Sequence, residues 1–336
     1  MVREYCVREY CVRDAHGTVL REQIVDIQSV TPETLQRSVI AVPPLARDDQ
    51  GRVCPDANHR IVRFLEGGGV TTLLYGGNAV FYHLALSEFE FTLQTLVAGV
   101  SPATLVIPSI GPAYGMMMDQ IEILSEFAFP TAMVLPQLDV STVPGRAAGI
   151  RRAAERWGRP LVVYLKQDGY LDEAHVEALM RDGCVSAIKY AIVRPDAAQD
   201  PFLRSLLDRV GAERVVSGMG EQPAIVHLRD FGLSGFTSGC VCLAPDLSRL
   251  MLEATLRKDW DEAERLRALF EPLEDLRNEI HPIRVLHAAV ELAGVAPTGA
   301  ITPLLSDLSE TQLADVARAA RQLLSLSTVS LDPNDD

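Results

Sequence analysis

The chain has 336 residues, of which 48% are hydrophobic, 6% aromatic and 23% charged, as expected of a globular protein with a large core. Its formal net charge of −14 argues against non-specific binding of nucleic acids or attachment to anionic membranes. Small anionic substrates are not excluded, because a single lysine or a helix N-terminus can bind a carboxylate.

Residues 1–37 precede the first clear strand signal. The pentapeptide VREYC occurs twice, at 2–6 and 7–11, and its five-residue period fits neither a helix nor a strand, so we assign it no function. Its valine, tyrosine and cysteine suit a short strand. Charges throughout this N-terminus indicate that it is not a signal peptide. The segment TPETLQRS predicts a short helix capped by Thr31.

From residue 38 onward, short apolar runs alternate with amphipathic segments, several of which end in glycine. Each run ends at a turn residue or a polar position, as buried parallel strands do. The predicted strands are 38–44, 71–76, 103–109, 131–137, 161–166, 185–190, 214–218 and 234–239. Eight strands alternating with helices, at roughly 25–35 residues per unit, predict an α/β fold, the (β/α)8 TIM barrel. The rival is a doubly wound sheet, but no glycine-rich phosphate turn follows the first strand.

Beyond residue 246 the pattern becomes helical. The segment LSRLMLEATLRK completes the barrel, and three further amphipathic stretches follow it. We therefore expect an N-terminal segment at 1–37, a barrel at 38–258, and a C-terminal helical extension and tail at 259–336.

The six cysteines form no CxxC pair and have no accompanying histidine cluster: Cys6, Cys11, Cys54, Cys184, Cys240 and Cys242. We expect neither a structural zinc site nor a cofactor. Sparse cysteines fit a reducing cytosol, and no apolar stretch reaches the ~20 residues of a membrane span. The sequence therefore indicates a soluble, cytoplasmic protein.

One lysine, Lys189, lies inside the apolar run VSAIKYAIV at 185–193. A buried ammonium is costly to desolvate, so a lysine in mid-strand seldom occurs without a function. An edge strand with the lysine in water is the alternative, but a closed barrel has no edges. Lys189 stands near the end of the sixth predicted strand, where barrel enzymes place their chemistry. Dry surroundings lower the pKa of a lysine, and a neutral amine can form an imine with a ketone.

Imine chemistry also requires a group that moves protons. Tyr164 ends the fifth predicted strand, 25 residues before Lys189, so one βα unit separates them. Neighbouring parallel strands lie about 4.8 Å apart, so both side chains can reach one substrate carbon. An ordinary strand aromatic is the alternative role for Tyr164.

Residues from about 38 to 325 resemble the dihydrodipicolinate synthase/N-acetylneuraminate lyase family of Schiff-base barrels. The passages that carry the likeness are SVIAVPPLARDDQGRV, GGVTTLLYGGNAVFYHLALSEFEFTL, VVYLK with SAIKYA, SGFTSGCVCLAPDL and EIHPIRVLHAAVELAG. The resemblance implies that Lys189 is the imine lysine and Tyr164 the proton-relay tyrosine. It also implies an extension packed on the barrel and a homo-oligomer, commonly a homotetramer of paired dimers.

Several loops depart from the family pattern. The usual second-strand loop reads Gly-Thr-Thr-Gly-Glu, whereas this chain reads GGNAV at 76–80, with Gly77 and Asn78 at both threonine positions. The loop can still bind a carboxylate through backbone N–H groups and the Asn78 amide, but it supplies no hydroxyl. Gln137 stands where the synthase has a tyrosine pair, and YLKQDGYLD lacks the arginine that grips the synthase's second substrate. The sequence therefore predicts neither dihydrodipicolinate synthesis nor sialic-acid cleavage.

Two further residues complete the predicted substrate-binding set of Gly77, Asn78, Gln137, Glu221 and Gly239. Glu221 follows the seventh strand at a helix N-terminus, where a carboxylate is also favourable as a cap. Gly239 ends the eighth strand, in the glycine-bearing loop of the resemblance.

The sequence thus predicts a class I lyase or aldolase acting on pyruvate or another 2-oxo acid through an imine on Lys189. A dehydratase of a 2-keto-3-deoxy sugar acid would use the same imine and is the main alternative. A barrel without catalysis, serving as a binding or regulatory protein, is a second, motivated by the altered GGNAV loop. A metal-dependent aldolase is disfavoured, because no cluster of metal-binding residues is predicted at the strand ends.

Overall fold

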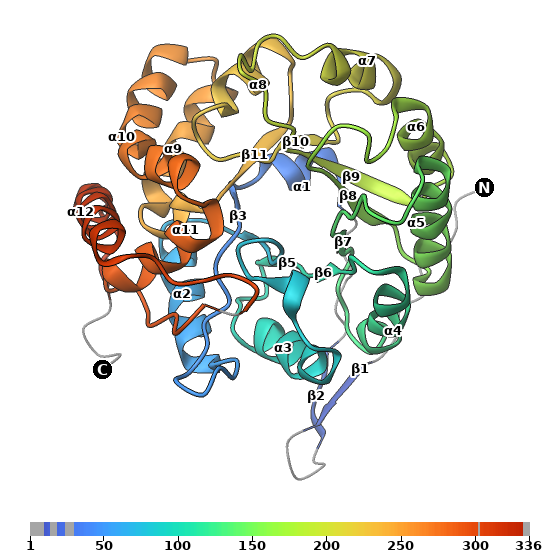
Figure 1. Ribbon diagram of the computed structural model, residues 1–336, viewed down its shortest axis with the longest axis horizontal. Coiled ribbons are helices and arrows are strands. Elements are labelled where there is room, and N and C mark those ends of the chain that lie inside the picture. The colour runs from blue at the N-terminus through green and yellow to red at the C-terminus, as the bar shows by residue number, and fades with distance from the viewer. Residues whose placement is uncertain (1–9, 14–18, 24–29, 302, 332–336) are drawn as a thin grey trace.

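A short hairpin precedes the barrel in the computed structural model (Figure 1). The structure describes residues 10–13, 19–23, 30–301 and 303–331. The hairpin consists of the antiparallel strands β1 (Tyr10–Arg13) and β2 (Val19–Gln23). The repeated VREYC lies outside the described residues except for its last two positions, which begin β1.

Parallel strands form the barrel at the centre of the molecule. Their bounds are β3 (Ile40–Ala41), β4 (Thr72–Leu74), β5 (Leu105–Ile107), β6 (Ser109–Ile110), β7 (Met133–Val134), β8 (Leu161–Leu165), β9 (Val185–Tyr190), β10 (Val215–Ser217) and β11 (Gly235–Ser238). They pair in the order β5-β4-β3-β11-β10-β9-β8-β7-β6. The two ends of this order, β5 and β6, are separated in the chain only by Pro108, which has no N–H to donate. They are one interrupted strand, so eight strands close on themselves and the predicted (β/α)8 barrel is confirmed.

Helices surround the strands on the outside (Figure 1). They are α2 (Pro55–Gly67), α3 (Leu86–Ala98), α4 (Tyr114–Leu124), α5 (Val143–Trp157), α6 (Glu173–Arg181), α7 (Pro201–Val210), α8 (Ala224–Asp230) and α9 (Pro245–Leu256). Every residue of β8 and β9 is buried, because one face of each strand fills the barrel and the other packs under these helices. This double burial explains why the strands read as continuous apolar runs.

Helix α1 (Pro32–Gln36) lies at the amino-terminal end of the barrel strands. The Thr31 hydroxyl accepts a hydrogen bond from the backbone N–H of Thr34 at 3.3 Å, so the predicted cap is confirmed. A Cβ on Gly235, the first residue of β11, would lie 2.9 Å from the Leu35 carbonyl oxygen. Only glycine therefore allows this close approach of α1 to the barrel.

The C-terminal extension consists of α10 (Trp260–Glu279), α11 (Pro282–Leu292) and α12 (Glu310–Leu326). Helix α10 packs beside α9 and α12, and α11 packs beside α12 (Figure 1). A Cβ on Gly239, just after β11, would lie 2.2 Å from Leu286 Cδ1 of α11, so the extension reaches the carboxyl end of the barrel. Among the helices of the described segments, none combines the length and apolar character that a membrane span needs.

Candidate active site

Lys189 and Tyr164 lie on neighbouring strands near the carboxyl end of the barrel. The parallel register of β8 and β9 pairs the two residues directly. Lys189 Nζ lies over the Tyr164 ring, 4.7 Å from its centroid. Both side chains are buried, with 5% and 9% of their surface exposed. The structure therefore brings the two predicted catalytic residues together, while their chemical roles stay predictions.

The alternation of side chains along β9 turns Lys189 into the barrel. Tyr190 faces outward, where its ring stacks on Phe202 of α7 with the centroids 6.4 Å apart. Successive residues of a strand point to opposite faces, so Lys189 points inward. A shift of one residue in this strand would exchange the two and place the lysine under the helices.

Burial controls the charge of Lys189. Burial, followed by the nearby charges of Arg277 and Lys166, lowers the pKa of Lys189 to about 7. A substantial fraction of the amine is therefore neutral at neutral pH, and only the neutral amine is a nucleophile.

We expect imine formation on Lys189 to follow this pKa. The initial rate of adduct formation with pyruvate and cyanoborohydride should rise about tenfold from pH 6 to pH 8, because the neutral fraction of an amine with a pKa of about 7 rises by that factor. Mass spectrometry of the protein after timed quenching measures this rate. A midpoint above pH 9 would show an ordinary, solvated lysine.

Tyr164 has the charge state of a proton donor. Burial raises the pKa of Tyr164 to about 12, and the charge of Arg277 opposes this rise. The phenol is consequently protonated at neutral pH. Among the described residues, the Tyr164 hydroxyl has no hydrogen-bond partner, which leaves it available to a substrate.

Two residues near Tyr164, which are Lys166 and Tyr82, were not predicted from the sequence. Lys166 Nζ lies 5.6 Å from the centroid of the Tyr82 ring, which belongs to the short helix η1 (Phe81–His83). Burial and then the proximity of Tyr164 raise the pKa of Tyr82. Lys166 follows Tyr164 by two residues, the spacing at which strand side chains share a face, and this signal could have identified it.

The loop after β4 presents unpaired backbone N–H groups. Among the described residues, neither Gly77 nor Asn78 donates its backbone N–H in a hydrogen bond, although the Gly77 carbonyl accepts one from Val80 at 2.9 Å. The Asn78 side chain donates to the Val42 carbonyl oxygen at 2.9 Å. A Cβ on Gly239 would lie 2.8 Å from Asn78 Nδ2, so three predicted substrate-binding residues meet at this point.

Comparison of the sequence with protein-family models finds no match, and comparison with curated proteins finds none either. Solved structures do match. A dihydrodipicolinate synthase from Bacillus clausii, 24% identical, superposes with a TM-score of 0.76 over 88% of this chain and 98% of that chain. The chain has the dihydrodipicolinate synthase fold.

Two further structures share this dihydrodipicolinate synthase fold. PhdJ, solved bound to a substrate intermediate, is 20% identical with a TM-score of 0.77, over 89% of this chain and 98% of that chain. A sialic acid aldolase from Ruminococcus gnavus, solved with its catalytic lysine mutated, is 14% identical with a TM-score of 0.74, over 87% and 97% of the two chains. The resemblance seen in the sequence is thus confirmed in the fold, and at these identities the fold is what the likeness establishes.

The other two predicted substrate-binding residues, Gln137 and Glu221, differ in their exposure to solvent. Gln137 is exposed in the loop after β7. Glu221 is fully buried, and its two carboxylate oxygens accept hydrogen bonds from Ser248 at 2.7 Å and Ser238 at 2.8 Å. These serine contacts support a structural role for Glu221, and its contact with substrate stays a prediction.

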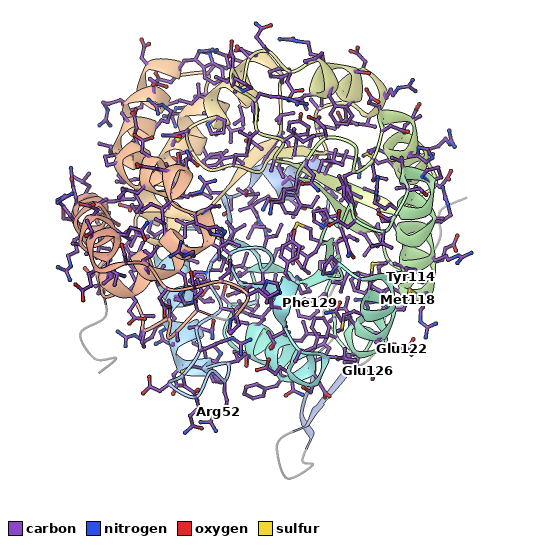
Figure 2. All side chains as sticks on the ribbon, in the orientation of Figure 1. Arg52, Tyr114, Met118, Glu122, Glu126 and Phe129 are labelled. Carbon is purple, nitrogen blue, oxygen red and sulfur yellow. The ribbon has the colours of Figure 1, made fainter. Side chains whose placement is uncertain are left out.

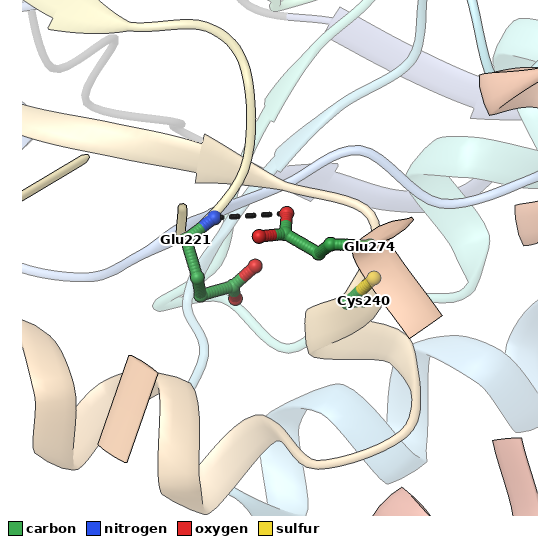
Figure 3. A group of neighbouring side chains, drawn as sticks. All are labelled: Glu221, Cys240 and Glu274. Atoms are coloured by element: carbon green, nitrogen blue, oxygen red, sulfur yellow. Dashed lines mark hydrogen bonds between the residues drawn. The ribbon is translucent and has the colours of Figure 1, made fainter. Parts of the chain in front are cut away.

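Glu221 belongs to a buried cluster with Cys240 and Glu274 (Figure 3), whose potential ligand atoms lie within 4.8 Å of one another. Glu274, on α10, accepts the backbone N–H groups of Glu221 at 3.0 Å and Gln222 at 2.7 Å. Burial raises the pKa of the Cys240 thiol well above its ordinary value, so it is a poor thiolate ligand. All four carboxylate oxygens accept protein hydrogen bonds, and we assign no metal to the cluster.

The two carboxyl groups of this cluster titrate as a pair. Burial raises the pKa of both, and the negative charge of Glu221 helps to raise that of Glu274 to about 8. Arg277 and two backbone N–H groups stabilise negative charge on Glu274. The pair therefore holds one shared proton at neutral pH.

Replacing Glu221 by glutamine should make stability less dependent on pH. A carboxyl group whose pKa is raised in the folded state stabilises it below the unfolded pKa, near 4.5, and loses that contribution as the pH rises through the folded pKa. The wild type should lose stability relative to Glu221→Gln from about pH 5 to about pH 8, the pKa of its partner Glu274, by up to about 1.4 kcal/mol per pH unit. Urea unfolding of both proteins over this range measures the difference, and a constant difference would contradict the shared proton.

Proposed function

We propose that the protein is a class I, Schiff-base lyase that acts on a 2-oxo acid, as an aldolase or a dehydratase. One observation carries the proposal: the buried Lys189 amine, with a pKa of about 7, lies over the ring of the protonated Tyr164. A neutral amine beside a proton donor, at the carboxyl end of a barrel, is the arrangement that imine formation requires.

In the proposed reaction the neutral Lys189 amine attacks the C2 carbonyl of the substrate. Tyr164 relays the amine's proton to the carbonyl oxygen, which gives a carbinolamine, and protonation of the new hydroxyl releases water and leaves a protonated imine. In aldol cleavage the imine accepts the electron pair of the C3–C4 bond while a base takes the proton of the C4 hydroxyl, which gives an enamine and an aldehyde. In dehydration a base removes a C3 proton, the imine accepts the electron pair of that C–H bond, and the enamine expels the protonated C4 hydroxyl as water. Hydrolysis then regenerates the lysine and releases the second product.

The backbone N–H groups of Gly77 and Asn78 are proposed to bind the C1 carboxylate. They have no acceptor among the described residues, and adjacent N–H groups in a turn form a favourable anion site. A Cβ on Gly77 would meet nothing within 4 Å, so space for a ligand is open beside it. Gly239 leaves room for the neighbouring Asn78 side chain, because any larger residue would collide with the Asn78 amide and with Leu286.

Proteins of the same fold support this assignment. The Ruminococcus gnavus sialic acid aldolase has a catalytic lysine, and PhdJ has been solved with a substrate intermediate. We infer that this chain is a divergent member of the same family. It contains three lysines, Lys166, Lys189 and Lys258, of which Lys189 is buried in a barrel strand.

The experiment is reductive trapping. The purified protein is incubated with cyanoborohydride and, in separate samples, each of a panel of 2-oxo acids that begins with pyruvate. Mass spectrometry then measures the intact mass of the protein in each sample. We expect one reduced adduct per chain, on the peptide that contains Lys189. No mass gain with any member of the panel would reject the proposal and favour a barrel that binds without catalysis. The 2-oxo acids that form adducts are then incubated with the protein without cyanoborohydride. Analysis of their products separates aldol cleavage, which yields an aldehyde, from loss of water.

We further propose a cytoplasmic homo-oligomer, as expected of this family. Tyr114, Met118 and Glu122 follow one another at four-residue spacing along the side of α4 next to α5, where Glu122 pairs with Arg156 (Figure 2). Tyr114 is 47% exposed, and Phe91 on the neighbouring α3 is 48% exposed. Large exposed side chains of this kind fit a subunit contact, which light scattering of the purified protein would test.

A further inference from the structure

Arg277, near the end of α10, reaches from the C-terminal extension to the segment after β10. Its Nη1 donates hydrogen bonds to the Met219 carbonyl oxygen and to Glu274 Oε1, both at 2.9 Å. The Arg277 side chain is 13% exposed. These contacts hold the guanidinium in one orientation through a single nitrogen.

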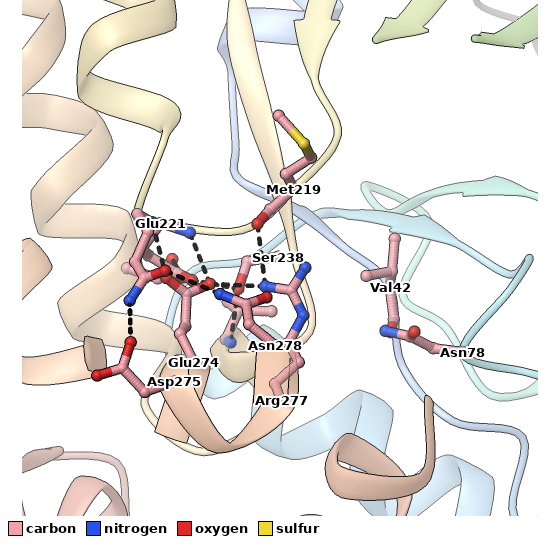
Figure 4. Close-up of polar contacts among 12 residues, drawn as sticks. Val42, Asn78, Met219, Glu221, Ser238, Glu274, Asp275, Arg277 and Asn278 are labelled. Carbon is pink, nitrogen blue, oxygen red and sulfur yellow. Dashed lines mark hydrogen bonds and ion pairs between the residues drawn. The ribbon is translucent and has the colours of Figure 1, made fainter. Parts of the chain in front are cut away.

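The other edge of the guanidinium is unused. Among the residues that the structure describes, Nε and Nη2 of Arg277 have no hydrogen-bond partner. Figure 4 shows these nitrogens turned away from Glu274, toward the side where Val42 and Asn78 lie. Nε and Nη2 present parallel N–H groups, the geometry that binds both oxygens of a carboxylate. The ion pair with Glu274 explains why Arg277 is held, but not why this edge faces the barrel.

Arg277 acts on both proposed catalytic residues. Arg277 donates to the carbonyl oxygen of Met219, and the preceding residue, Gly218, lies against Lys189. A Cβ on Gly218 would be 2.9 Å from Lys189 Cγ. The charge of Arg277 lowers the pKa of Lys189 and that of Tyr164. Lys189 and Arg277 therefore lie against consecutive residues of the segment after β10, so that one substrate can contact both.

The surroundings of Lys189 are cationic although the chain as a whole is acidic. The two neighbouring charges that shift the pKa of Lys189 are Arg277 and Lys166, and both are positive. The formal net charge of the chain is −14. Lys166 and the edge of Arg277 that Glu274 does not pair therefore favour an anionic group of the substrate at this end of the barrel.

We propose that Arg277 binds a second acidic group of the substrate, so that the enzyme acts on 2-oxo acids that carry a further carboxylate. The inference rests on the proposed function and specifies its substrate class. The C1 carboxylate binds at the loop after β4, C2 reacts with Lys189, and the distal carboxylate binds Nε and Nη2 of Arg277. The extension thus supplies the arginine that is missing after Tyr164.

Binding of unreactive diacids tests the inference independently of imine chemistry. Calorimetry compares succinate, glutarate and adipate with butyrate, which has one carboxylate. At least one diacid should bind the wild type about tenfold or more tightly than butyrate, and Arg277→Met should remove this preference, since a bidentate charge-assisted contact is lost. In the reductive assay, the half-saturating concentration of 2-oxoglutarate or 2-oxoadipate should rise about tenfold in Arg277→Met, while pyruvate should be trapped by both proteins.

Three variants control for structural effects. Arg265→Met removes an exposed arginine of the same helix, which pairs with Glu262, and should leave all binding unchanged. Arg277→Lys keeps a charge without the bidentate edge and should recover part of the preference. Glu274→Gln/Arg277→Met removes both partners of the ion pair, so that no unbalanced buried carboxylate destabilises the fold, and should show the same loss as Arg277→Met.

The outcomes separate the two proposals. If the wild type binds diacids and butyrate equally, or if Arg277→Met keeps the preference, the inference about Arg277 is wrong, whatever happens at Lys189. If no 2-oxo acid forms an adduct but diacid binding depends on Arg277, the imine proposal fails and the anion site stands.

Discussion

Replacing Lys189 by methionine should abolish the covalent adduct with 2-oxo acids and reduce lyase turnover by on the order of 10⁴-fold or more, the scale of removing a covalent nucleophile. Methionine has a similar length and no charge, so it fills the same space in the barrel without leaving a cavity. Trapping followed by mass spectrometry measures the adduct, and product formation measures turnover.

The same substitution should stabilise the folded protein. The pKa of Lys189 falls from 10.5 to about 7 on folding, so the unfolded chain holds this proton more tightly. The resulting cost to stability is largest below pH 7 and disappears as the pH approaches 10.5, and it amounts to about 3–5 kcal/mol. Lys189→Met should therefore unfold at higher urea concentration than the wild type at neutral pH. A gain in stability joined to a loss of activity would identify a residue retained for chemistry.

Lys166→Met is the matched control, because Lys166 is the second lysine near the site and is exposed directly after β8. It should keep the adduct on Lys189. Its loss also removes a positive neighbour, so the pKa of Lys189 and the pH profile of trapping should shift upward. An adduct that persists in Lys189→Met and disappears in Lys166→Met would transfer the imine to Lys166.

Replacing Tyr164 by phenylalanine should slow imine formation and turnover by about 10²–10⁴-fold, the usual contribution of a positioned proton donor. The ring remains, and with it the contact with Lys189 Nζ at 4.7 Å and the packing inside the barrel. Stability should therefore change by less than about 1 kcal/mol. Timed trapping and steady-state kinetics measure the rates, and urea unfolding measures stability.

Tyr82→Phe provides the comparison for this result. Tyr82 lies beside Tyr164 and has a raised pKa through burial, so it is the other phenol near the site. A large loss in Tyr164→Phe with little change in Tyr82→Phe supports Tyr164 as the relay. The reverse pattern would assign the relay to Tyr82, and unchanged rates in both variants would exclude a phenol from it.

Much of the barrel was predictable because its determinants are local. A buried strand of a barrel needs a short apolar run and a helix that follows it, and both are visible in the order of residues. The pairing of Lys189 with Tyr164 was predictable for the same reason: one βα unit separates them, and the parallel register observed between β8 and β9 sets them side by side. The interruption at Pro108 escaped prediction, since the run 103–109 reads as one strand.

The rest of the candidate site depends on contacts between distant segments. Arg277 and Glu274 lie on an amphipathic helix whose charged residues read as a solvated face, and only the packing of α10 against the end of β10 buries Glu274 and aims Arg277 at the barrel. Likewise Glu221 looked like a helix cap or a substrate ligand, and the structure surrounds it with Ser238 and Ser248.

The sequence by itself therefore determined the barrel, the buried lysine and its tyrosine neighbour, because periodicity and strand order encode them. Only the tertiary structure decided which charges surround that lysine. Electrostatic interactions act through space and depend on burial, and neither distance nor burial between α10 and β9 can be read from residues 88 positions apart, as Lys189 and Arg277 are.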